Sequence, residues 1–163
     1  MVGCAGQLIM LAPNLTVYMT TQHNLIDSGG NMIVELDHIA IAVSKLDEAL
    51  QIYEKILGLK LEKTMVVEDQ KVRLAFLLAG ETRIELLEPT ATESAVSRFI
   101  EKKGEGIHHI ALKVTNIEGF LKQLKEKGIA LVDEKPRVGA EGGKIAFLHP
   151  KTLKNVLIEL CEP

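Results

Sequence analysis

The sequence is poor in cysteine, in long apolar runs and in net positive charge, and each shortage excludes a class of protein. Its two cysteines, Cys4 and Cys161, form neither a CxxC pair nor a disulfide framework, which fits the reducing cytoplasm where we expect the protein to reside. No apolar run approaches the roughly 20 residues that span a bilayer, so we expect no membrane insertion. With a net charge of -3 and scattered lysines, we expect no nucleic-acid partner.

Positive charge is missing altogether from the first part of the chain, where no Lys or Arg precedes Lys45. A secretory signal peptide needs a positive n-region and a transit peptide needs arginines, so neither is indicated. Met32 stands directly before the first well-patterned strand. We therefore hypothesise that Met32 is the native start, and we assign residues 1–32 to a poorly packed N-terminal extension of one domain at 33–163.

The first half of this domain predicts a strand, a helix and three more strands. The segment ELDHIAIAV, at 35–43, alternates and is rich in β-branched residues, which is typical of a strand with one buried face. An amphipathic helix follows, with Ser44 as its N-cap and Gly58 as its terminator. The later predicted elements are strands at 60–67, 72–78 and 82–87 and a linker helix at about 92–104.

The pattern then restarts. HIAIAVSKL at 38–46 matches HIALKVTNI at 109–117, an offset of 71 residues, and IELLEP at 84–89 matches IELCEP at 158–163, an offset of 74. Two βαβββ copies explain both matches: module 1 covers about 35–89 and module 2 about 107–163. The second copy begins its helix at Thr115 or Asn116. We place the three-residue difference in the glycine-rich loop 139–143.

The fold class expected from this repeat is α+β. One small sheet covered by one helix leaves its other face bare, so two copies should associate across their open faces. The result would be a curved sheet around a cleft.

Each copy offers a histidine early in its first strand and a glutamate in its last strand. Pseudo-two-fold symmetry would bring together His38, Glu85, His109 and Glu159. Two imidazoles and two carboxylates suit Co²⁺, Zn²⁺, Ni²⁺, Mn²⁺ or Fe²⁺ and leave positions for water or substrate. A lone strand histidine is more often a hydrogen-bonded core or surface residue than a ligand. The repeated order of histidine and glutamate favours the ligand interpretation.

Two further histidines are weaker candidates. His108 precedes His109 directly, so strand alternation points it to the opposite face, where it would support the site or the structure. His149, in FLHPK, could serve a turn before Pro150 or donate into a ligand pocket, and we favour the turn.

Five motifs cover nearly the whole domain: LDHIAIAV, IELLEP, GEGIHHIAL, EKPRVGAEGGKIAFLHPK and VLIELCEP. With them the chain resembles the vicinal-oxygen-chelate (glyoxalase/bleomycin-resistance) superfamily, and within it the methylmalonyl-CoA epimerases. The resemblance implies paired βαβββ modules around a metal, with the same four ligands, and a homodimer. It implies a divalent ion, Co²⁺ first, with Zn²⁺, Mn²⁺ or Ni²⁺ as alternatives. Some epimerases have glutamine where this chain has Glu85.

The activity that the resemblance implies is metal-assisted interconversion of the two methylmalonyl-CoA epimers through an enolate. Glu159 is our first choice as a catalytic base. The second base is Glu85, by symmetry, or a bound water, because the strand at 72–77 reads VRLAFL and lacks the glutamate that some members carry. Lys144, His149 and Lys151 could meet coenzyme A phosphates, although loop lysines are usually solvated.

Two other functions stay open. A glyoxalase I-type lyase could use the same four ligands on a glutathione hemithioacetal. A metal-free protein that binds a small hydrophobic compound would share the architecture without the chemistry.

Overall fold

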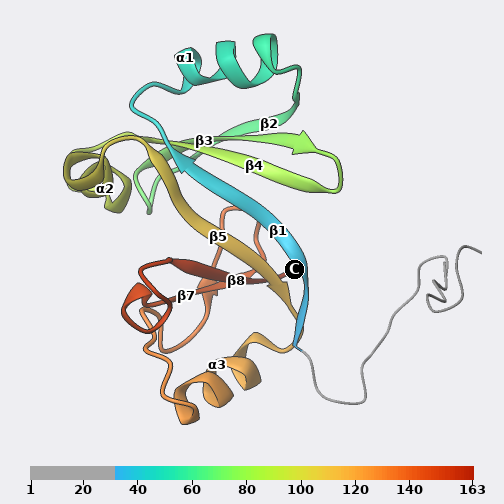
Figure 1. The fold of residues 1–163 in the computed structure, drawn as a ribbon, viewed down its shortest axis with the longest axis vertical. Helices are drawn as coiled ribbons and strands as arrows, with labels where there is room; N and C mark the ends of the chain where they lie inside the picture. The colour runs from blue at the N-terminus through green and yellow to red at the C-terminus, as the bar shows by residue number, and fades with distance from the viewer. Residues whose placement is uncertain (1–31) are drawn as a thin grey trace, which may run out of the picture. The chain divides into compact units, whose positions relative to one another are not determined.

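The computed structural model describes residues 32–163, and its core is one eight-stranded sheet in the order β2-β3-β4-β1-β5-β8-β7-β6 (Figure 1). The strands are β1 Ile33–Ala42, β2 Lys60–Val67, β3 Val72–Ala79, β4 Thr82–Pro89, β5 Gly106–Val114, β6 Arg137–Val138, β7 Lys144–Leu148 and β8 Ile158–Glu162. The helices are α1 Leu46–Leu50, its π-helical continuation Gln51–Ile56, α2 Ala95–Lys103, α3 Ile117–Glu126 and a short 3-10 turn Pro150–Thr152. The predicted extension, apart from Met32, lies outside the described residues.

The predicted duplication is confirmed by the strand pairing. Within each module the first strand pairs in parallel with the last, β1 with β4 and β5 with β8. The two modules then join through the antiparallel β1–β5 pair. The β2–β3–β4 group and the β7–β8 group lie at opposite ends of this long central pair (Figure 1). The expected curved sheet is present, but the prediction that the copies associate across their open faces was wrong, because they join edge to edge into one continuous sheet.

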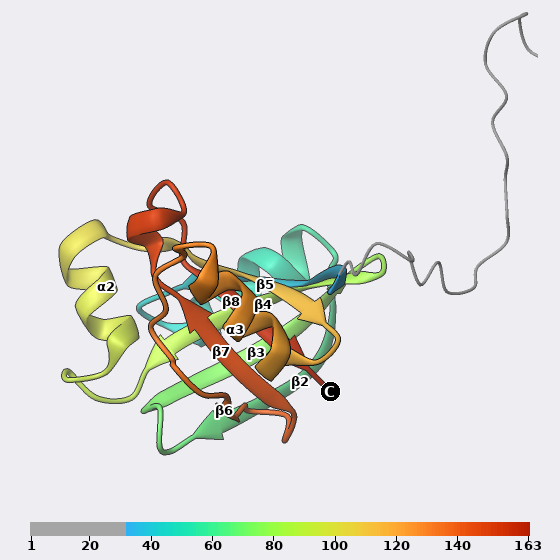
Figure 2. The same cartoon turned by 90° about the horizontal axis from the view of Figure 1, so that it is seen from below.

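Three helices cover different parts of the sheet. Helix α1 packs on β3 and β4 through a cluster that includes Leu46, Ala75 and Leu86. Helix α3 occupies the same place on module 2, over β7 and β8 (Figure 2), and buries Ile117 and Leu121. Helix α2 uses Val96 to pack against the cluster on the other face. That face holds the candidate site. In residues 32–163, no helix is long and apolar enough to cross a membrane.

The starts of the two equivalent helices differ from each other. Asn116 is the N-cap of α3, and its side chain accepts a hydrogen bond from the Gly119 amide at 3.1 Å. The prediction of Ser44 as a cap was wrong, because the cap position of α1 is Lys45 and no side chain bonds there. The Ser44 amide instead donates to the Glu105 carboxylate at 2.5 Å.

The three-residue difference between the modules also lies elsewhere than predicted. Phe76 pairs with Glu85 in module 1, and Phe147, 71 positions later, pairs with Glu159 in module 2. The offset therefore stays at 71 through the loop 139–143. It changes in the connection between β7 and β8, which is longer than the tight β3–β4 turn because it contains the 3-10 turn.

Candidate metal centre

Four ionisable side chains converge on the inner face of the sheet, one from each of its four central strands. His38 on β1, Glu85 on β4, His109 on β5 and Glu159 on β8 are only 4% to 6% exposed. The two Nε2 atoms lie 3.2 Å apart. Glu159 Oε2 is 2.7 Å from His109 Nε2, and Glu85 Oε2 is 3.4 Å from His38 Nε2. The structure thus brings together all four predicted residues.

Small residues beside each histidine make this convergence possible. Ala40 lies opposite Glu85 in the β1–β4 ladder, and Ala111 lies opposite Glu159 in the β5–β8 ladder. Each alanine is two residues beyond a histidine and therefore shares its face. Both alanines are fully buried. An alanine side chain leaves space for the neighbouring carboxylate, so one local solution is used twice.

Two β-bulges place extra side chains beside the histidines. Leu36 and His38 pair with Leu112 and Ala111, which leaves Asp37 as an extra residue on β1. In the same ladder, the pairings of Ala40 with His109 and Ile41 with Ile107 leave His108 as the extra residue on β5. A bulge interrupts strict alternation. The prediction that His108 faces away was therefore wrong, and its Nδ1 lies 2.9 Å from His109 Nδ1.

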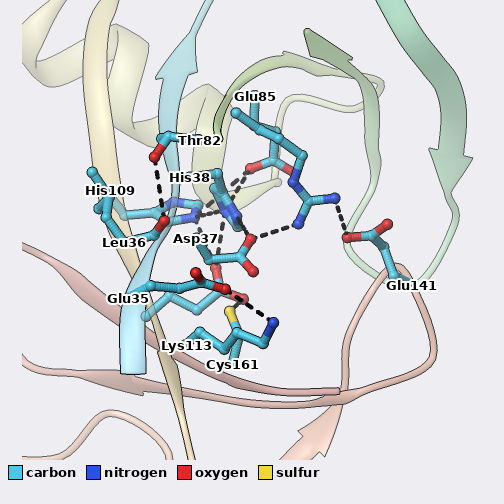
Figure 3. Close-up of polar contacts among 12 residues, drawn as sticks. Glu35, Leu36, Asp37, His38, Thr82, Glu85, His109, Lys113, Glu141 and Cys161 are labelled. Atoms are coloured by element: carbon cyan, nitrogen blue, oxygen red, sulfur yellow. Dashed lines mark hydrogen bonds and ion pairs between the residues drawn. The ribbon is translucent and has the colours of Figure 1, made fainter. Parts of the chain in front are cut away.

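In module 1 the bulge residue is a carboxylate. His38 Nδ1 lies 2.8 Å from Asp37 Oδ1, and Arg83 Nη2 donates to the same oxygen at 2.5 Å (Figure 3). The hydrogen bond from His38 lowers the pKa of Asp37 to about 2, against the opposing effect of burial and with help from Arg83. Burial alone would lower the pKa of His38, but hydrogen bonds to Asp37 and Glu85 outweigh it and raise the pKa to about 10.

In module 2 the bulge residue is an imidazole. Burial, and then the nearby charge of His109, lower the pKa of His108 to about 4, so His108 is neutral at physiological pH. Burial raises the pKa of Glu159, but the hydrogen bond from His109 outweighs this effect and the pKa lies below its ordinary value. The Cys161 thiol donates to Glu159 Oε1 at 3.6 Å. Glu159 is therefore an ionised and oriented carboxylate.

This donor set fits a divalent ion. Each histidine has a polar partner at Nδ1, which leaves both Nε2 atoms directed at the same point. His38, His109 and Glu159 offer ligand atoms that all lie within 4.8 Å of one another. Glu85 Oε2 stands 3.7 Å from His109 Nε2 and so reaches the same point from module 1. Two imidazoles and two carboxylates are a ligand set for a borderline metal ion.

Aromatic rings and a cavity surround the four side chains. Phe76 packs edge-on against His38, with ring centroids 5.7 Å apart, and Phe147 packs in the same way on His109 at 5.2 Å. These residues line a cavity of about 920 Å³. Leu74 and Val96 form part of the apolar wall of this cavity. A cavity of this size is typical of small-molecule and cofactor sites.

Of the three residues predicted to bind coenzyme A phosphates, only Lys144 lines this cavity. Lys144 Nζ pairs with Glu118 at 3.0 Å. His149 and Lys151 are not among the residues that line this cavity. His149 Nδ1 instead accepts the Lys151 amide at 3.0 Å and caps the 3-10 turn, as favoured from the sequence.

Sequence reasoning missed several neighbours of the site. Phe76 and Phe147 obey the same 71-residue offset as the histidines, so the repeat itself carried that signal. Asp37 adjoins His38 in the sequence, but only the bulge shows that it contacts the imidazole. Arg83 carried no comparable signal, because its contact with Asp37 spans 46 positions.

Comparisons with known proteins agree with this architecture. Residues 37–147 match the model of the Glyoxalase/Bleomycin resistance protein/Dioxygenase superfamily. The human mitochondrial methylmalonyl-CoA epimerase is 38% identical over 126 residues, 77% of this chain and 72% of that protein. The Bacillus subtilis protein YqjC, described as uncharacterized, is 46% identical over 128 residues, 78% of this chain and 91% of that protein.

A solved structure gives the same result. A variant of the Streptomyces coelicolor methylmalonyl-CoA epimerase, in complex with 2-nitronate-propionyl-CoA, is similar with a TM-score of 0.76 and 37% identity, covering 80% of this chain and 94% of that chain. The chain therefore belongs to the Glyoxalase/Bleomycin resistance protein/Dioxygenase superfamily. Within it the chain belongs to the family of the methylmalonyl-CoA epimerases, which makes the protein an isomerase.

Proposed function

We propose that the protein interconverts the two epimers of methylmalonyl-CoA, by removing the proton at C2 and returning a proton to the opposite face. The observation that carries this proposal is the convergence of two histidines and two glutamates at the wall of one cavity. The similarity to methylmalonyl-CoA epimerases at 35% to 38% identity supports the choice of substrate.

In this proposal His38, Glu85, His109 and Glu159 hold a divalent ion. When bound, the ion supplies positive charge that polarises the thioester carbonyl and makes the C2 proton more acidic. The chain's own contribution is a fixed set of donor atoms at short distances, and Co²⁺ remains our first expectation. Each imidazole is held through Nδ1, so its Nε2 stays in the binding orientation.

Glu159 is the group we assign to the first proton transfer. It is ionised and buried, and one of its oxygens already accepts from the Cys161 thiol. The other oxygen, Oε2, faces the two histidines, so Glu159 would take the C2 proton onto Oε2 after this carboxylate has loosened from the ion on substrate binding. Glu85 comes from the other module, on the opposite side of the pseudo-two-fold axis, and we assign it to protonation of the second face. The apolar wall around Leu74 and Phe76 limits water near the reacting carbon.

Hydrogen exchange tests this function directly. Protein stripped of metal and then reloaded with Co²⁺ is incubated with one methylmalonyl-CoA epimer in deuterated water. We expect metal-dependent deuterium incorporation at C2 together with epimerisation. Metal binding without exchange would contradict the proposal, and activity on a glutathione hemithioacetal would redirect it to glyoxalase-type chemistry.

A further inference from the structure

We propose that Asp37 is a positioning residue for His38, and that Arg83 links it to Glu141 in module 2, so that a loop of one module holds a ligand of the other. The inference rests on the metal site of the proposed function and concerns residues outside the four ligands. It is supported by a chain of polar contacts that runs from His38 through Asp37 and Arg83 to Glu141 in the β6–β7 turn (Figure 3).

The first contact fixes the imidazole. Asp37 Oδ1 lies 2.8 Å from His38 Nδ1, and both side chains are largely buried. In the neutral imidazole that binds a metal ion, a carboxylate at Nδ1 holds the proton on that nitrogen and leaves the Nε2 lone pair for the ion. Because Asp37 sits in a β-bulge, its carboxylate reaches the same face as the imidazole that follows it.

The second contact fixes the carboxylate. Arg83 donates from Nη2 to Asp37 and from Nη1 to Glu141, the latter at 2.8 Å, and Glu62 Oε2 lies farther from Nη1, at 3.8 Å. Its guanidinium also stacks over the Phe76 ring, 4.5 Å from the ring centroid. A planar guanidinium that bridges two carboxylates and rests on an aromatic face has little freedom to move. Arg83 thus transmits the position of Glu141 to Asp37.

The third contact crosses between modules. Glu141 lies at the tip of the β6–β7 turn, where the Gly139 amide donates to the Gly143 carbonyl at 2.8 Å. A side chain at Gly143 would meet the Glu162 carbonyl oxygen at 2.7 Å, so the turn packs tightly on β8. Glu141 also pairs with Lys63 on β2 of module 1. The turn is therefore anchored in module 2 and paired to module 1.

Module 2 provides the internal contrast. His109 meets His108 at Nδ1, and His108 packs edge-on against Phe99 with ring centroids 5.0 Å apart. Within residues 32–163, His108 forms no hydrogen bond or ion pair with an arginine or a carboxylate. Within the described residues, the Asp37–Arg83–Glu141 contacts therefore support His38 and have no counterpart at His109, although the two modules supply the four donor groups symmetrically.

Metal affinity is the readout that separates positioning from general stability. Co²⁺ affinity is measured by competition with a chelator for the full-length wild type, Asp37→Asn, Asp37→Ala and Glu141→Gln. We expect Asp37→Ala to weaken binding about 10- to 100-fold, as supporting groups of metal ligands typically do. Asp37→Asn keeps an acceptor oxygen, so it should recover part of that loss. Glu141→Gln should weaken binding about threefold, on the scale of a partly exposed ion pair.

Two control variants isolate the row of contacts. Glu35→Gln removes a carboxylate two residues from Asp37 whose partner is Lys113, and Glu134→Gln removes an exposed pair with Lys125. Both should bind Co²⁺ as the wild type does. The visible absorption bands of bound Co²⁺ should shift in the Asp37 variants and stay unchanged in both controls, because these bands report the geometry of the ligands.

The double variant Asp37→Ala/Glu141→Gln tests the link. Since Glu141 acts through Asp37, its substitution should have no further effect once Asp37 is absent. Wild-type affinity in Asp37→Ala would overturn the positioning role, and additive losses would overturn the link through Arg83. A wild type that binds Co²⁺ without epimerising the substrate refutes the proposed function and leaves this inference standing. A wild type that binds no divalent ion refutes both.

Discussion

The two modules place the same kinds of side chain, a histidine and a glutamate, at the site. They differ in the side chains that contact these histidines from the other side. Ala40 faces Glu85 as Ala111 faces Glu159. Behind the histidines the symmetry ends, because the bulge residue is a carboxylate in module 1 and an imidazole in module 2. The repeat therefore preserves ligand geometry, while each module supplies a different electrostatic environment.

The two glutamates also have different neighbours. Two residues beyond Glu159 stands Cys161, whose thiol donates to the carboxylate, whereas Leu87 occupies the same place beyond Glu85. One carboxylate is thus supported by a weak donor and the other by an aliphatic side chain. This difference is the structural reason for giving the two carboxylates unequal roles, and each variant below tests one part of it.

The largest effect should come from exchanging the carboxylates for amides. Glu159→Gln should lower kcat by about 10² to 10⁴, the usual contribution of a general base. Glu85→Gln should lower kcat by only about tenfold, because an amide oxygen can still bind an ion and a bound water, the alternative second base, can return the proton to the second face. Steady-state kinetics with Co²⁺-loaded protein measures both, and circular dichroism checks the fold. Equal losses in the two variants would remove the distinction between the modules.

Removal of the metal should show that both modules hold it. An ion present at about 100 times its dissociation constant stabilises the folded protein by about 2.7 kcal/mol, which corresponds to a shift of about 10 °C in Tm. Thermal unfolding with and without a chelator measures this shift. His38→Ala and His109→Ala each remove one donor and should both abolish the difference. A full shift in either variant would show that one module binds the ion alone.

A carboxylate placed in the module 2 bulge should be harmful. His108→Asp gives module 2 the bulge residue of module 1 without an equivalent of Arg83, and the new charge would lie against Phe99. We expect a loss of about 1–3 kcal/mol in the free energy of unfolding, the cost of a poorly satisfied buried polar group. Urea unfolding of the metal-free protein measures it. His108→Asn, which is uncharged, is the matched variant and should lose less.

The smallest effect should come from the thiol. Cys161→Val removes the donor to Glu159 Oε1 and makes this position aliphatic, as Leu87 is in module 1. A net hydrogen bond contributes about 0.5–1.5 kcal/mol, and a thiol is a weak donor, so kcat should fall about two- to fivefold. Co²⁺ affinity should fall less than in the Asp37 variants, because the thiol contacts Oε1 and the oxygen that faces His109 is Oε2. Unaltered kcat would mean that the thiol does not orient Glu159.

The repeat in the sequence predicted most of the fold and brought the four site residues together, because strand pairing is periodic and the two copies share one register. It could not predict the bulges. Alternation assumes one residue per position on each strand, whereas Asp37 and His108 are additional residues that no periodicity reveals. The Arg83–Glu141 pair was also beyond reach, since it joins β4 to the β6–β7 turn across 58 positions.

With the ion held as we propose, the antiparallel β1–β5 ladder would make ion binding and the pairing of the two modules one thermodynamic event. Two donor groups lie on each side of this ladder, so an ion can be fully bound only while the strands are paired. By reciprocal linkage, whatever strengthens the pairing raises the affinity for the ion by the same free energy. Ile41 and Ile107 pair in the same ladder, beyond the site. A substitution there that weakens the strand pairing would therefore lower the affinity for the metal ion.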